Sequence, residues 1–187
     1  MSQQFWSETL VAGDVTSGTK FVSYTTAKSV TPPGAAISLP ANFFNIGRKM
    51  RMTIVGSESH TTGGTMTFQF QLGAVAALSS GALTMTTTTH TDFPFIATCY
   101  VQCRSVGTST AATLLGQWIV QGQGFAMTSA ADNAAGTGYA IGPATIPAVG
   151  TGFDSTATQT LDFFAAVSVS NSSSGIQVHE FIVEALN

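Results

Sequence analysis

The chain has 187 residues, a length that suits one all-β domain and is sufficient to bury a real core. Only 8% of the residues are Asp, Glu, Lys or Arg, where about 25% is usual, and the formal net charge is −3. Its six scattered Lys and Arg residues are too few for the basic patch of a nucleic-acid-binding protein, and so little charge favours packing between subunits.

The first eight residues have no basic start and no apolar segment after them, so no export signal is expected. No apolar run reaches the eighteen or more residues of a membrane-spanning helix. We therefore expect a protein made in the cytoplasm with no membrane partner.

Residues 1–18 are predicted to form an N-terminal arm ahead of the first strand-like pattern. Its large apolar residues are Phe5, Trp6, Leu10 and Val11, and these are the residues we expect to bind a partner. Two interpretations remain open: they cover one end of their own domain, or they strap the arm onto a neighbouring subunit.

Alternation of apolar and polar residues dominates the rest of the chain and is typical of strands with one buried face. It is clearest where Met66, Phe68, Phe70 and Leu72 alternate with Thr and Gln. Similar or shorter candidates lie at 21–24, 35–39, 50–54 and 161–169.

Three further runs are apolar at both parities, at 93–101, 114–120 and 176–183. Such a run predicts either a central strand or a strand whose outer face meets a neighbouring subunit. A bulge near His179 would turn the two halves of the last run inward as one set.

Two segments depart from the strand pattern. Residues 73–83 have the best helical propensity, but glycines and a serine pair limit a helix there to one or two turns. Residues 126–158 are rich in Ala, Gly, Thr and Ser and are predicted to form a long loop excursion, with room for a small extra hairpin.

About eight strands separated by Gly-, Pro- and Ser-rich turns predict an all-β fold. Without crossover helices a parallel sheet is excluded, which leaves an antiparallel β-sandwich. We predict a single jelly-roll domain over residues 19–187, with the excursion at 126–158.

Cys99 and Cys103 are the only cysteines. On one strand they would lie about 13 Å apart, too far for a disulfide, so buried free thiols are expected. The histidines His60, His90 and His179 are far apart in sequence and have no metal-ligand spacing, so no metal site is expected.

Signatures of catalysis are weak throughout. The nine carboxylates show no obvious pair, no G-x-S-x-G motif occurs, and the segment 136–142 resembles a dinucleotide loop only loosely. We therefore expect no enzyme, no cofactor and no small-molecule substrate. A glycan site would need an exposed aromatic residue beside Asp or Asn, and Tyr139 with Asp132 and Asn133 is the only such cluster.

Several segments resemble a group of small structural proteins of tailed bacteriophages. The main one is LPANFFNIGRKMR at 39–51, where a turn and a Gly-Arg-Lys sequence lead into an amphipathic strand. Others are CRSVG at 103–107, PAVGTGFDST at 147–156 and IQVH at 176–179. The resemblance covers most of the chain after the arm and implies a virion component, with no catalytic residues to carry over.

Two hypotheses follow from this resemblance and the low charge. The first is a capsid decoration (auxiliary or cement) protein on the outer surface of the virion, binding the major capsid protein and copies of itself, as a homotrimer. The alternative is a tail, baseplate or fibre component that contacts a host receptor or glycan.

Overall fold

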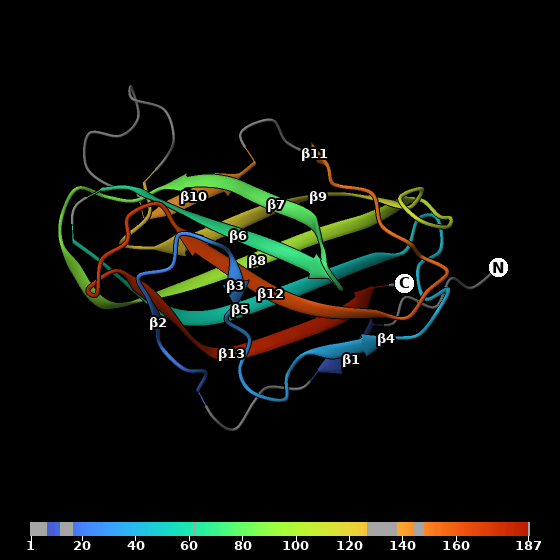
Figure 1. The fold of residues 1–187 in the computed structure, drawn as a ribbon, viewed down its shortest axis with the longest axis horizontal. Coiled ribbons are helices and arrows are strands. Elements are labelled where there is room, and N and C mark those ends of the chain that lie inside the picture. The colour runs from blue at the N-terminus through green and yellow to red at the C-terminus, as the bar shows by residue number, and fades with distance from the viewer. Residues whose placement is uncertain (1–6, 12–16, 62, 127–137, 144–147, 187) are drawn as a thin grey trace.

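The computed structural model describes residues 7–11, 17–61, 63–126, 138–143 and 148–186 (Figure 1). Within these ranges the chain has no helix, so none that could cross a membrane, and thirteen strands. In chain order the strands are β1 (Ser7–Val11), β2 (Phe21–Val22), β3 (Lys28–Ser29), β4 (Ile37–Leu39), β5 (Lys49–His60), β6 (Thr65–Leu72), β7 (Val75–Thr84), β8 (His90–Ser105), β9 (Thr113–Gly122), β10 (Tyr139–Gly142), β11 (Ala148–Val149), β12 (Gln159–Val167) and β13 (Gly175–Leu186).

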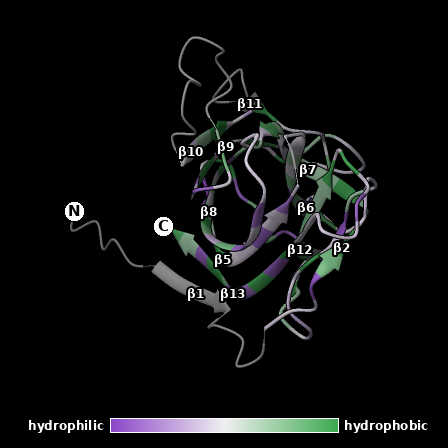
Figure 2. Cartoon of the chain, turned by 90° about the vertical axis from the view of Figure 1, so that its left-hand side faces the viewer, coloured by the Kyte–Doolittle hydropathy of each residue, from purple (hydrophilic) through white to green (hydrophobic). Residues whose placement is uncertain are grey.

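The strands form two antiparallel sheets. Sheet A has the order β1-β13-β5-β8-β9-β10, with β2 also paired to β13 and β11 to β9. Sheet B has the order β3-β12-β6-β7, with β4 also paired to β12. Figure 2 shows β8, β5 and β13 on one side of the interior and β12, β6 and β7 on the other. The predicted all-β antiparallel sandwich is confirmed.

The strand pairs are nested along the chain. Strand β6 pairs with β7, β5 with β8, β3 and β4 with β12, and β1 and β2 with β13. This is the pairing of one long antiparallel ribbon, and the additional pairs β5–β13 and β6–β12 arise where the ribbon rolls into a sandwich. The topology is consistent with the expected jelly roll, to which β9, β10 and β11 add strands between β8 and β12.

The two inner faces meet in a cluster of aromatic rings. Phe68 of sheet B lies 5.7 Å from Phe95 and 5.8 Å from Trp118 of sheet A, measured between ring centroids. Phe125 and Phe163 approach the same ring at 6.0 and 5.2 Å. All five side chains are buried, and rings at these distances attract one another beyond their buried area. The alternating residues predicted inward at 50–54 and 66–72 all belong to this core.

The expected bulge is present in β13. Its register against β5 shifts between Val178 and Glu180. As a result Ile176 and Val178 before the shift and Phe181 and Val183 after it are all fully buried. One extra residue therefore turns both halves of the strand toward the same core.

The prediction of at most a short helix at 73–83 was wrong. This segment is β7, which pairs with β6 along its length with two register shifts. Gly73 makes the turn between the two strands at φ +56° and Gly81 also has positive φ, +67°. Pairing with β6 and burial of Leu78 and Leu83 outweigh a weak local helical preference.

Part of the predicted excursion joins sheet A. Strands β10 and β11 each pair with β9, at successive positions along its edge, so the expected extra hairpin is not formed between them. Two glycines here lie against β7: a Cβ on Gly142 would be 2.2 Å from the Ser80 carbonyl oxygen, and one on Gly150 would be 1.6 Å from that of Ala77. No other residue type fits such an approach without displacing the β7 backbone.

Replacing Phe68 with alanine is expected to lower the free energy of unfolding by about 3–5 kcal/mol, because it opens a cavity between the sheets. Denaturant titration followed by tryptophan fluorescence measures this. The control Val106→Ala, at a side chain 42% exposed, should change stability by less than about 0.5 kcal/mol. Equal effects of the two substitutions would contradict the role assigned to the ring cluster.

Candidate functional site

The outer face of sheet A is the candidate site. Alternation that buries one side of β5, β8, β9, β10 and β13 turns the other side to the surface. The side chains of this face are Lys49, Arg51, Thr53, Val55, Ile96, Thr98, Tyr100, Gln102, Leu115, Gln117, Ile119, Gln121, Tyr139, Ile141, Glu180, Ile182, Glu184 and Leu186. Arg104, exposed near the end of β8 on the same parity, belongs to this face as well, so three lysine or arginine residues and two glutamates give it a formal charge of +1.

Apolar side chains on this face lie beside one another across the strands. Ile141 of β10 is directly opposite Ile119 of β9, and Ile96 of β8 is opposite Val55 of β5. Ile96 is 46% exposed. Side chains opposite one another in antiparallel strands are within contact distance, so these pairs form apolar patches that cross the sheet. Large contiguous apolar patches are a feature of protein-binding surfaces, and these two pairs supply part of the apolar area that a partner on this face would cover.

The charges of the face are partly neutralised within it. Arg51 lies between Tyr100 and Glu184, its partners on the neighbouring strands, and contacts Glu184 Oε2 through both Nε and Nη2 at 2.6 Å. The hydrogen bond from Arg51 lowers the pKa of Glu184, and the same bond, with a further one to Tyr100, raises the pKa of Arg51. A partner that covers this row meets an ion pair already formed.

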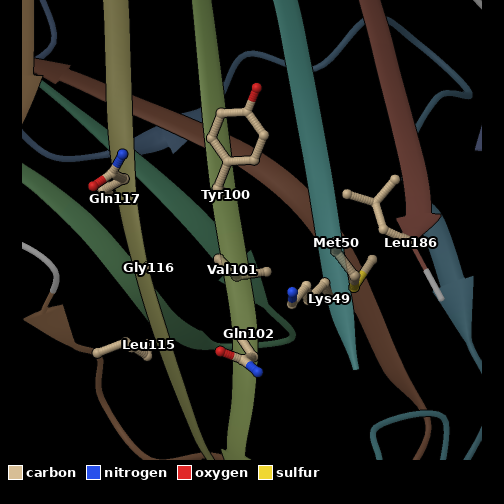
Figure 3. Close-up of a pocket in the computed structure, with 9 residues that line it drawn as sticks. All are labelled: Lys49, Met50, Tyr100, Val101, Gln102, Leu115, Gly116, Gln117 and Leu186. Atoms are coloured by element: carbon tan, nitrogen blue, oxygen red, sulfur yellow. The ribbon is translucent and has the colours of Figure 1, made fainter. Parts of the chain in front are cut away.

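A shallow depression of about 200 Å³ lies beside this row (Figure 3). It crosses β9, β8, β5 and β13, with Tyr100, Leu115 and Leu186 as its large apolar side chains. Gln102, Gln117 and Lys49 supply hydrogen-bond donors around it. The depression has the size and chemistry to take one large side chain of a partner, apolar in its body and polar at its tip.

The residues predicted to bind a partner are only partly described. Phe5 and Trp6 lie outside the described residues. Leu10 and Val11 belong to β1, whose backbone pairs with β13 of the same chain at the edge of sheet A. Their role in partner binding stays a prediction. Of the candidate glycan cluster, Tyr139 begins β10, while Asp132 and Asn133 are outside the described ranges.

A buried polar cluster was missed in the sequence. The structure brings Glu58 and His60 of β5 against His90 of β8, with the His60 Nδ1 atom 2.8 Å from Glu58 Oε2. The two histidine rings are stacked with their centroids 4.9 Å apart. Glu58 and His60 share one parity of a strand, which was the available signal, but only the β5–β8 pairing shows that His90 joins them.

The thiols are as expected. Cys99 and Cys103 of β8 are buried and free. Burial raises the pKa of both thiols, that of Cys99 strongly, which keeps them protonated and unreactive at neutral pH. Among the described residues, no three His, Cys, Asp or Glu side chains are grouped so that they could hold a metal ion.

Comparison of the chain with protein-family models, with curated proteins and with solved structures finds no match in any of the three. Function is therefore inferred from the residues and their geometry. The resemblance of 39–51 and the later segments to tailed-phage structural proteins stays an expectation from the sequence.

Substituting Arg51 by glutamine is expected to raise the pKa of Glu184 back toward its usual 4.5, because the main hydrogen bond to the carboxylate is lost. Since the folded pKa is depressed, the pair stabilises the fold at neutral pH, and this contribution disappears as the pH falls through the folded pKa. Its size is at most about 1 kcal/mol, because Arg51 is partly exposed.

Carboxyl NMR titration of Glu184 measures the shift. Lys49→Gln is the matched control, since it removes a cation from the same strand without touching the ion pair. An unchanged Glu184 titration in Arg51→Gln would show that the pair does not persist in solution.

Proposed function

We propose that this chain is a non-enzymatic structural subunit of a phage particle, and most specifically a capsid decoration protein that binds the outer surface of the major capsid lattice. The observation that carries the proposal is the outer face of sheet A, which presents apolar side chains and little net charge across five strands. The sequence resemblance at 39–51 supplies the virion context.

The contact chemistry of this face suits docking to another protein. Tyr and Arg are enriched among residues that dominate binding energy, and Tyr100 and Arg51 occupy neighbouring positions here. Ile96, Ile119 and Ile141 would bury apolar area at about 25 cal/mol per Å² when a partner covers them. Each contact is weak alone, but a subunit that joins its own copies gains from binding several lattice sites at once.

A tail, baseplate or fibre role is favoured by one feature, the depression beside Tyr100. An aromatic ring flanked by the amides of Gln102 and Gln117 also suits the apolar face and hydroxyl groups of a sugar. Copy number separates the two functions, because decoration requires hundreds of copies per particle and a fibre only tens or fewer. Mass spectrometry of purified particles gives this ratio to the major capsid protein, and a handful of copies would rule out the decoration role.

Substituting Ile96 by glutamate is expected to weaken binding to shells that lack this protein by about thirtyfold, since a central contact worth about 2 kcal/mol is lost and a carboxylate is placed in an apolar interface. Co-sedimentation with the shells measures the affinity. The matched control is Val106→Glu, at a side chain of similar exposure, 42%, outside sheet A's outer face. Because the face carries a formal charge of only +1, binding of the unmodified protein should change little between low and moderate salt.

Equal binding by Ile96→Glu and the unmodified protein, with both folded, would place the contact on another surface. Loss of binding in Val106→Glu alone would have the same meaning.

A further inference from the structure

Three titratable side chains are buried together where β5 ends and β8 begins. Glu58 is 1% exposed, His60 4% and His90 8%. Thr86, in the connection between β7 and β8, contacts both histidine rings. None of these three side chains belongs to the outer face of sheet A, so an inference about them does not depend on the proposed function.

The hydrogen bonds of His60 define where one proton must be. The Nε2 atom lies 3.0 Å from the Thr86 carbonyl oxygen, which can only accept, so Nε2 carries a hydrogen. The Nδ1 atom lies 2.8 Å from Glu58 Oε2, and this bond needs one more hydrogen, on the nitrogen or on the carboxyl oxygen. Either way Glu58 and His60 together have no net charge.

A proton added to His90 would not be balanced in this way. The Nε2 atom of His90 lies 3.1 Å from the Thr86 hydroxyl oxygen, but its Nδ1 atom is buried and has no hydrogen-bond partner among the described residues. The nearest carboxylate oxygen in the described part of the chain, Glu58 Oε1, is 4.0 Å away and has no hydrogen-bond partner there. The Glu58 carboxylate has little room to move, because a Cβ on Gly124 would lie 1.8 Å from Oε1.

The cluster would therefore bind a second proton only weakly. It would place a charge on His90, whose ring is stacked at 12° on that of His60. Burial lowers the pKa of His90 below its usual 6.5, and His60 lowers it further, while Glu58 opposes both.

Among the described residues, the other charged groups lie outside the cluster. Lys20 and Asp92 pair with each other, and His179 bonds to Ser17 and Ser57. A small cavity lies beside His60. The other described side chains that line it, from β6, from β12 and around Met85, are uncharged.

We propose that Glu58, His60 and His90 form an acid-sensitive latch, which holds the connection between β7 and β8 in place at neutral pH and releases it when His90 takes up a proton. The connection is held through Thr86. Besides its contacts to both histidines, Thr86 donates its N–H to the Gly124 carbonyl at 2.9 Å and accepts the N–H of Gly63 at 3.0 Å. Loss of the stack between the two histidine rings thus loosens three segments at one end of the sandwich. These are the β7–β8 connection, the residues at Gly63 and the residues at Gly124.

The direction of the pH effect follows from the lowered pKa. As the pH falls through about 6.5, His90 binds less proton in the folded chain than in the unfolded chain, so acid favours unfolding. One such group raises the unfolding equilibrium constant by up to about tenfold for each pH unit, down to the folded pKa.

The test compares the unmodified protein with His90→Gln, which retains a hydrogen-bonding group toward Thr86 but does not titrate. Denaturant unfolding is measured from pH 6.5 to pH 5.0. Relative to His90→Gln, the unfolding constant of the unmodified protein should rise as the pH falls, with about tenfold per pH unit as the upper limit. His179→Gln, at a more exposed histidine outside the cluster, is the control for the loss of an imidazole group. Parallel pH profiles for the unmodified protein and His90→Gln would overturn the latch.

If His90→Gln does not fold, two measurements on the unmodified protein test the proposed latch. Imidazole NMR should show His90 titrating below pH 6.5, and a midpoint above that value contradicts the proposal. Hydrogen exchange should show protection of the Thr86 and Gly63 amides falling between pH 6.5 and pH 5.0, while the amides of β6 keep theirs. Uniform loss of protection in both regions would mean global acid unfolding and no latch.

Discussion

The contact of one ring, Phe68, with rings from both sheets is the interaction on which the sandwich depends. Phe95 and Trp118 reach it from sheet A, and Phe163 reaches it from its own sheet. The chain has few charges and no disulfide among its described residues, so apolar packing between the sheets is its main source of stability. This packing also fixes which parity of each strand points inward.

The packing between the sheets also determines which residues of each strand point outward. Once Trp118 and Val120 of β9 enter the core, Ile119 must face outward, and once Phe95 and Ala97 of β8 are inside, so must Ile96. In most surface strands these outward positions are polar. The outer face of sheet A therefore presents apolar side chains that are not part of the core. Beside them lies the Arg51–Glu184 ion pair, in which each charge is balanced by the other.

The sequence allowed the inner face to be predicted better than the pairing. Alternation at 66–72 and the change of parity in β13 were sufficient to predict β6 and the bulge at His179. Apolar residues at both parities of 93–101 indicated a second covered or bound face. Residues 73–83 could not be assigned correctly, because their strand conformation depends on pairing with β6 and has no strong local signal.

The buried cluster was beyond sequence reasoning for the same physical reason. Glu58 and His60 are thirty or more positions from His90, and only the register of β5 against β8 places the three side chains together. The long Ala- and Gly-rich segment likewise hid β10, which is short and gains its stability from β9 rather than from its own residues.

Gly142 and Gly150, which lie in and beside the strands that extend sheet A, cover the β7 edge of sheet B. A free strand edge offers unpaired backbone groups that can template the growth of fibrils, and a chain with so little charge has weak electrostatic protection against this. Because Gly142 and Gly150 let the chain lie directly against β7, that edge is shielded by its own polypeptide. A second chain therefore cannot pair directly with β7 at these two positions, and fibril growth from this edge is disfavoured.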